Sequence, residues 1–180
     1  MAQIIDARQL PANNSPSLDV QGFKFLSAPS SGFAQVGDFY DPDSVEADYY
    51  PEVEAALRRE AGVDRVLVFD HITRNPTPPT GSASAADPRG YVTHVHCDYT
   101  EVGARRRAEQ LLGADAAVEW DSGGRRLGIL QLWRPIGPGP VLSNPLALLD
   151  ASTVDDSEQI EVKLQCTCTR KLTSRSLLWQ

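Results

Sequence analysis

Residues 64–70 read DRVLVFD, and this β-branched, apolar run predicts a buried strand. Tyr91 to Tyr99 (YVTHVHCDY) alternates like a strand, and Leu127 to Trp133 (LGILQLW) is another short apolar run. Val20 to Leu26 (VQGFKFL) predicts a further strand, although Gly22 weakens it. Short apolar runs of this kind, separated by loops rich in proline and glycine, predict a mainly β fold with flanking helices.

Two segments carry helix signals. Residues 41–62 begin with acidic side chains and end at Gly62 after two arginines, and Pro51 should divide them into two helical pieces. Residues 101–113 (EVGARRRAEQLLG) predict a second helix that stops at Gly113. For the first helix, the expected cap is Asp43 or Ser44, and the side chains expected to pack inward are Tyr49, Tyr50, Val53 and Leu57.

The composition is that of an ordinary folded domain with an acidic surface. The 180 residues are 41% hydrophobic and 23% charged, which argues against wholesale disorder and against a fibrous repeat. The formal net charge of −7 argues against a general binder of nucleic acids or anionic membranes, because phosphate surfaces attract basic proteins. No apolar run approaches the roughly 18 residues of a membrane-spanning helix. We therefore expect a cytoplasmic protein with no nucleic-acid or membrane partner.

Three metal-binding side chains, His94, His96 and Asp98, alternate along the strand expected at 91–99. Residues two apart on a strand point to the same face, about 6.5 to 7 Å apart, so neighbours could share one metal ion. All three would span roughly 13 Å and would need a bulge to meet at one ion. Two pairs therefore stay open, His94 with His96 and His96 with Asp98. The second pair is two-thirds of the 2-His-1-carboxylate triad that holds Fe(II); alternatively, it is only a hydrogen-bonded pair.

Three blocks of the sequence resemble one known family. They are YYPEVEAALRREAGVDRVLVFDHITR at 49–74, HVHCDYT at 94–100 and LQLWRPIGPGPVLSNPLALLDASTV at 130–154. The family is the gibberellin-desaturase-like group of non-haem iron, 2-oxoglutarate-dependent oxygenases, which includes fungal hydroxylase/desaturases and a cephamycin methoxylation-related protein. The resemblance covers about residues 18–160, in the family's order.

The resemblance implies a fold, two cofactors and a set of site residues. It implies a jelly-roll (double-stranded β-helix) core, Fe(II) and 2-oxoglutarate as cofactors, and oxidation of a small secondary-metabolite substrate. His96 and Asp98 would be the iron ligands, and Tyr99 and Thr100 complete the motif. His94 would then lie beside the site, supporting a ligand or lining the substrate pocket with Tyr99 and Thr100.

Several further residues have a functional and a structural interpretation. By resemblance, Trp133 could wall the substrate pocket and Arg134 could bind a cofactor carboxylate. Alternatively, Trp133 is a core residue, which we favour, and Arg134 anchors the loop through backbone carbonyls. We expect His71 to bond a neighbouring turn and not to bind metal, and we expect Cys97 to be a small core residue.

The resemblance ends where the composition changes. No histidine follows Asp98, whereas family members are longer and carry a distal iron histidine and an arginine that binds 2-oxoglutarate. We therefore expect an oxygenase-like domain at 1–164, with an incomplete jelly-roll, and a divergent basic tail at 165–180. An altered reading frame, a retained intron or an alternative end is our hypothesis for this tail. Coding DNA that lacks a family-like histidine block in every downstream frame would contradict it.

Three functions remain as candidates. The leading interpretation is a hydroxylase/desaturase-like oxidoreductase that uses Fe(II) and 2-oxoglutarate. The alternative is a catalytically inactive family member that binds a ligand or a partner protein, because two ligands hold iron poorly. A metal-dependent hydrolase or cupin-like isomerase is a third possibility, and it would need His94, His96 and Asp98 to meet at one ion.

Overall fold

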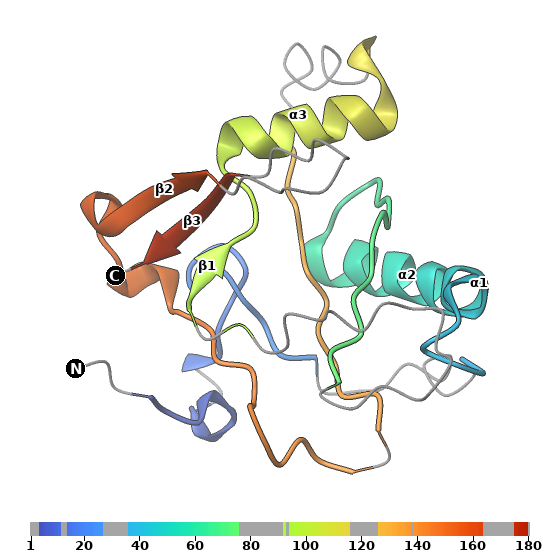
Figure 1. Cartoon of the computed structure of the whole chain (residues 1–180). Coiled ribbons are helices and arrows are strands. Elements are labelled where there is room, and N and C mark those ends of the chain that lie inside the picture. The colour runs from blue at the N-terminus through green and yellow to red at the C-terminus, as the bar shows by residue number, and fades with distance from the viewer. Residues whose placement is uncertain are drawn as a thin grey trace. The chain divides into compact units, whose positions relative to one another are not determined.

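A computed structural model of the chain describes residues 4–11, 14–26, 36–75, 92, 94–115, 126–137, 139–163 and 175–179. Its helices and strands are α1 (Pro42–Ser44), α2 (Tyr50–Ala61), β1 (His96–Cys97), α3 (Glu101–Leu112), β2 (Gln159–Lys163) and β3 (Arg175–Trp179) (Figure 1). The chain divides into two units, Met1–Val92 with Trp133–Ser152 and Thr93–Leu132 with Thr153–Gln180. The two units are described separately below.

The long helical run of the first unit begins after Asp41. The side chain of Asp41 accepts a hydrogen bond from the backbone N–H of Asp43, and Pro42 occupies the first turn. The expected cap at Asp43 or Ser44 is therefore wrong, because the proline allows the helix to start earlier. The run ends at Gly62, whose φ of 63° is left-handed, as the sequence predicts.

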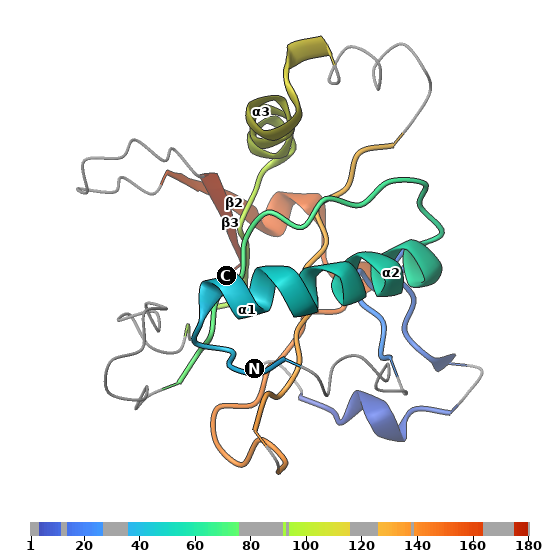
Figure 2. The same ribbon diagram turned by 90° about the vertical axis from the view of Figure 1, so that its right-hand side faces the viewer.

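Pro51 changes the type of helix without interrupting it. The π-helical segment η4 (Val45–Tyr49) joins α1 to α2, and the backbone N–H of Tyr50 bonds the carbonyl of Val45. Pro51 then lies in the first turn of α2, where a missing N–H costs little. The expected division into two helical pieces at Pro51 is therefore wrong, because the proline falls in the first turn of α2; Figure 2 shows α1 and α2 as one continuous run.

One face of this helical run holds most of the described apolar core. Val45, Val53 and Ala56 are buried, and the other side chains expected to face inward are half-buried. The buried hydroxyl of Thr73 donates to the carbonyl of Phe39, 3.1 Å away. This hydrogen bond connects the segment before the helical run, at Phe39, with the segment after it, at Thr73.

Three predicted strands are not formed in the described chain. Residues 20–26, 64–70 and 127–133 have no strand pairing, and the described residues of the predicted strand at 91–99 form only the short strand β1. A short apolar run forms a strand only where a partner supplies backbone donors and acceptors, and the sequence does not name that partner. The jelly-roll core is not tested by these elements and stays a prediction.

Residues 20–26 contact other parts of their unit through an ion pair and a backbone hydrogen bond. Lys24 forms an ion pair with Glu60 at 2.9 Å, and the backbone N–H of Ala151 donates to the carbonyl of Gln21. The hydrogen bond from Lys24, and after it the one from Arg59, holds the pKa of the Glu60 carboxyl below its usual value. These contacts place the segment next to the end of α2 without a sheet.

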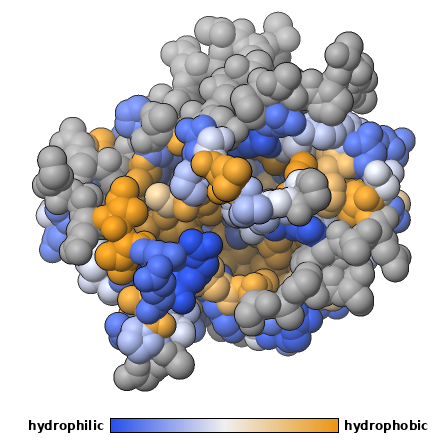
Figure 3. All heavy atoms as spheres, turned by 90° about the horizontal axis from the view of Figure 1, so that it is seen from below, coloured by the Kyte–Doolittle hydropathy of each residue, from blue (hydrophilic) through white to orange (hydrophobic). Residues whose placement is uncertain are grey.

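Many apolar side chains face solvent, and Figure 3 shows several gathered on the face that it presents. Leu142 is 91% exposed and Trp133 is 49% exposed, so the favoured interpretation of Trp133 as a core residue is wrong. Cys97 is also exposed, which corrects its expected place in the core. Both expectations assumed that each strand would be covered by a second sheet, and the described elements do not provide one.

The described residues of the second unit form a three-stranded antiparallel sheet in the order β1-β3-β2. His96 pairs with Leu178 and Cys97 with Leu177, while β2 pairs along its length with β3 from Gln159 opposite Trp179. Neither β2 nor β3 is among the strands expected from the sequence. The residues of β3 lie in the segment expected to be a divergent tail because of its composition, and composition carries no information about pairing.

Helix α3 follows β1 directly (Figure 1). The hydroxyl of Thr100 accepts a hydrogen bond from the backbone N–H of Gly103 at 3.1 Å, which caps the helix. Gly113 ends the helix with a φ of 86°, as predicted. None of the described helices is long and apolar enough to cross a membrane.

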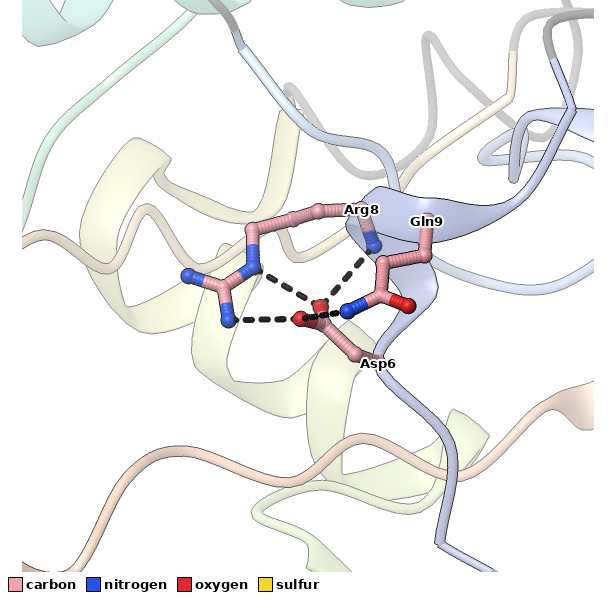
Figure 4. A network of polar contacts seen from close by, with 3 residues as sticks. All are labelled: Asp6, Arg8 and Gln9. Carbon is pink, nitrogen blue, oxygen red and sulfur yellow. Dashed lines mark hydrogen bonds and ion pairs between the residues drawn. The ribbon is translucent and has the colours of Figure 1, made fainter.

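A small polar network lies near the N-terminus. Asp6 caps the short 3-10 turn Ala7–Gln9, and its carboxylate accepts hydrogen bonds from Arg8 and Gln9 (Figure 4). The bonds from Arg8 hold the pKa of the Asp6 carboxyl below its usual value. Because the network is exposed, we expect it to order the turn locally and to add little to stability.

We predict that Val53→Ala lowers the free energy of unfolding by about 1–3 kcal/mol, because it removes buried methyl groups. The matched control is Val20→Ala, since Val20 is 55% exposed in the same unit. Urea unfolding followed by circular dichroism measures both variants. An equal loss from the two substitutions would contradict the assignment of Val53 to the core.

We predict that Thr100→Ala destabilises α3 by about 1 kcal/mol, because Gly103 loses its capping acceptor. Thr100→Ser keeps a hydroxyl and should retain most of the stability. Amide hydrogen exchange at Gly103 and at the first turn of α3 measures the effect. If serine is as harmful as alanine, Thr100 does not act through its cap.

Candidate metal site

β1 brings His96 and Asp98 together. β1 ends at Cys97, and Asp98 lies in the bend that follows. The Nε2 atom of His96 is 3.2 Å from the Oδ1 atom of Asp98, and their side chains are 28% and 47% exposed. The imidazole and the carboxylate therefore lie next to each other, although Asp98 is in the bend after β1 and not on the strand itself.

The second ring nitrogen of His96 is already engaged. Its Nδ1 atom lies 2.9 Å from the backbone carbonyl oxygen of His94. A carbonyl oxygen only accepts hydrogen bonds, so this contact places the proton on Nδ1. Nε2 then presents a lone pair toward Asp98 unless it gains a second proton. Two acceptors that lie this close together would both be stabilised by a cation that binds them.

The carboxylate of Asp98 is held from its other side. Its Oδ2 atom accepts a short hydrogen bond from the side-chain amide of Gln131. Sequence reasoning missed Gln131 as a site residue, although it lies in the LQLW block that carries the family resemblance. Its signal would have been a polar side chain within an apolar run, a pattern too common to single it out.

These atoms fit a bound Fe(II) ion. Two neighbouring ligands of an octahedral ion at about 2.1 Å lie about 3 Å apart, close to the observed separation of Nε2 and Oδ1. A neutral imidazole with a carboxylate is also a ligand set that ferrous iron accepts. Within the described ranges, however, no three His, Cys, Asp or Glu side chains form a group that could hold a metal.

The other residues of the motif have structural contacts. His94 supplies its backbone carbonyl to His96, and the described residues do not bring His94, His96 and Asp98 together as a three-ligand group. Thr100 caps α3, and Tyr99 is half-buried beside Gly103. The motif therefore includes the two candidate ligands, the backbone group that orients one of them, and the start of the next helix.

Arg134 belongs to the first unit and contacts backbone and aromatic groups there. Its Nε atom donates to the carbonyl of Pro135 at 3.2 Å. Its guanidinium carbon lies 5.6 Å from the ring centre of Phe39 and 5.9 Å from that of Tyr49, within the range of cation–π attraction. Burial raises the pKa of Tyr49, and the nearby guanidinium opposes this effect. These contacts favour the loop-anchoring interpretation over carboxylate binding.

His71 also has a structural partner in the first unit. Its Nδ1 atom lies 2.8 Å from the hydroxyl of Tyr50 in α2, so its partner is a helix and not the expected turn. Its backbone N–H donates to the carboxylate of Asp70. Burial is the main reason why the pKa of the Tyr50 hydroxyl is raised, and the negative charges of Glu46 and Asp70 add to this effect. Cys166 and Cys168, which we regard as thiols without metal, lie outside the described residues.

Comparison with known proteins finds fungal oxygenases. The chain is 33% identical over 150 residues to the Fe(II)/2-oxoglutarate-dependent dioxygenase nvfI of Aspergillus novofumigatus, which covers 83% of this chain and 50% of the relative. It is 27% identical over 148 residues to the alpha-ketoglutarate-dependent dioxygenase phiK of a fungal species, covering 81% and 50%. It is 28% identical over 151 residues to the hydroxylase/desaturase efuI of Hormonema carpetanum, covering 79% and 48%.

The chain spans about half the length of the curated relatives it matches. No solved structure matches it. One family model, described as an oxidoreductase/YMDC permease-like domain, matches residues 1–176 and thus nearly the whole chain. The chain therefore belongs to the oxidoreductase/YMDC permease-like domain family.

Proposed function

We propose that this chain carries the iron-binding strand of an Fe(II)/2-oxoglutarate-dependent oxidoreductase, built on a jelly-roll core. The observation that carries the proposal is the separation of 3.2 Å between Nε2 of His96 and Oδ1 of Asp98. The names of the relatives, dioxygenase and hydroxylase/desaturase, support the same chemistry. Membership of the gibberellin-desaturase-like group and a small secondary-metabolite substrate are parts of this proposal.

The residues of the site have separate tasks in this proposal. His96 binds the metal through Nε2, while the carbonyl of His94 keeps the proton on Nδ1. Asp98 binds through Oδ1 and neutralises part of the charge of the ion. Bound Fe(II) with 2-oxoglutarate supplies the oxidising chemistry. By resemblance, Tyr99 would line the substrate pocket beside these ligands.

The co-substrate needs a cationic partner for its carboxylate, and Arg134 is the candidate by resemblance. Its observed contacts, with Pro135 and two aromatic rings, instead fix the loop that it begins. We therefore leave Arg134 out of the mechanism and give it the structural role.

A second function, binding without catalysis, is favoured by one observation. The described residues bring together two metal ligands and no group of three. Since Fe(II) in this class of site is held by three protein ligands, a two-ligand site would bind iron weakly. The chain would then act as a ligand-binding or interaction protein.

We predict that the wild-type chain binds one equivalent of Fe(II) under anaerobic conditions, and that His96→Ala and Asp98→Ala each weaken binding at least about tenfold. Isothermal titration calorimetry measures the dissociation constants. The matched control is His71→Ala, because His71 is a histidine of the other unit with Tyr50 as its partner. Absence of binding by the wild type, or an equal loss from the control, refutes the site.

Turnover separates the two proposed functions. We expect the wild-type chain, supplied with Fe(II), oxygen and 2-oxoglutarate, to release more succinate than the His96→Ala/Asp98→Ala double variant. Chromatography with mass detection measures the succinate. Iron binding without succinate release above the double variant would favour the binding protein over the oxidoreductase.

A further inference from the structure

We propose that Gln131 is a positioning residue for the metal site: its amide fixes the carboxylate of Asp98 so that only Oδ1 faces His96. This inference rests on the proposed function in so far as the oriented carboxylate is a metal ligand. Two contacts support the inference: the hydrogen bond from the Gln131 side chain to Oδ2, and the 3.2 Å separation of Oδ1 from His96 Nε2.

A carboxylate without such a partner has no preferred oxygen. Its two oxygens are chemically equivalent, and a side chain that is 47% exposed can turn either of them toward a neighbour. The amide hydrogen of Gln131 removes this equivalence, because it occupies Oδ2. An N–H donor and a cation repel each other, so a metal ion would approach Oδ1. Asp98 would therefore bind through one oxygen.

The contact needs a side chain at position 131 that can donate a hydrogen bond. Gln131 lies 33 residues from Asp98 in the same unit, so chain proximity does not account for their meeting. Gln131 is an exposed residue, and packing does not fix its side chain either. The amide reaches Asp98 as a neutral donor; a leucine would supply no donor, and a glutamate would repel the carboxylate.

The two candidate ligands are thus supported in matching ways. The carbonyl of His94 takes the proton of His96 Nδ1 and leaves Nε2 toward the site. The amide of Gln131 donates a hydrogen bond to Oδ2 of Asp98, so Oδ1 is the oxygen that faces the site. Outer partners of this kind raise metal affinity because they restrict the ligands to the binding geometry before the ion arrives.

The test compares Gln131→Leu with Gln110→Leu, a matched control on the exposed surface of α3. Titration with Co(II), followed by its visible absorption, gives the dissociation constant of the metal alone. We expect Gln131→Leu to weaken Co(II) binding about 10–100-fold and the control to leave it unchanged. The urea midpoint of the metal-free protein should be the same for both variants, which separates positioning from a general structural role.

A second measurement needs no metal. At one fixed pH, carbon and nitrogen NMR report the carboxyl carbon of Asp98 and Nε2 of His96 in the metal-free protein. We expect Gln131→Leu to shift both signals and Gln110→Leu to shift neither. Unchanged signals in Gln131→Leu overturn the inference whatever the metal result.

The two measurements also keep the two proposals apart. Shifted signals with no Co(II) or Fe(II) binding by the wild type would support the orientation of Asp98 by Gln131 and refute the proposed function. Shifted signals with equal Co(II) affinity in wild type and Gln131→Leu would overturn Gln131 as a positioning residue while leaving the metal site intact.

Discussion

The candidate site depends on one electrostatic constraint: Nε2 of His96 and Oδ1 of Asp98 face each other as two acceptors. The constraint arises because the proton of the imidazole is committed to the carbonyl of His94 on the other side of the ring. A cation between the two atoms removes the conflict, and so does a second proton on the ring. The same arrangement can therefore act as half of a metal site.

The elements around this pair are short, and each fixes a neighbouring part of the chain. The pairing of β1 with β3 fixes the backbone position of His96. Thr100, two residues after Asp98, caps α3 and fixes where that helix begins. Asp98 lies between these two fixed points. A bend confined in this way restricts where the carboxylate can lie, so that a single amide from Gln131 is sufficient to orient it.

The sequence predicted the helices better than the strands, because helix signals are local. The arginines and Gly62 that end the long helix, and the Gly113 that ends α3, lie next to the residues whose structure they determine. A strand instead needs a partner elsewhere in the chain, and DRVLVFD gives no indication of one. The same reasoning explains the site: His96 and Asp98 follow from a two-residue period, whereas the contact of Gln131 crosses 33 residues.

The position of β3 in the sheet has a practical consequence. Because β3 lies between β1 and β2, the backbone opposite His96 belongs to a strand at the carboxyl end of the chain. An affinity tag or fluorescent protein fused at that end would continue from β3, the central strand of the sheet. It could disturb β3, which pairs with the backbone of His96. A tag at the amino end would instead belong to the other unit, which makes it the better choice for recombinant material.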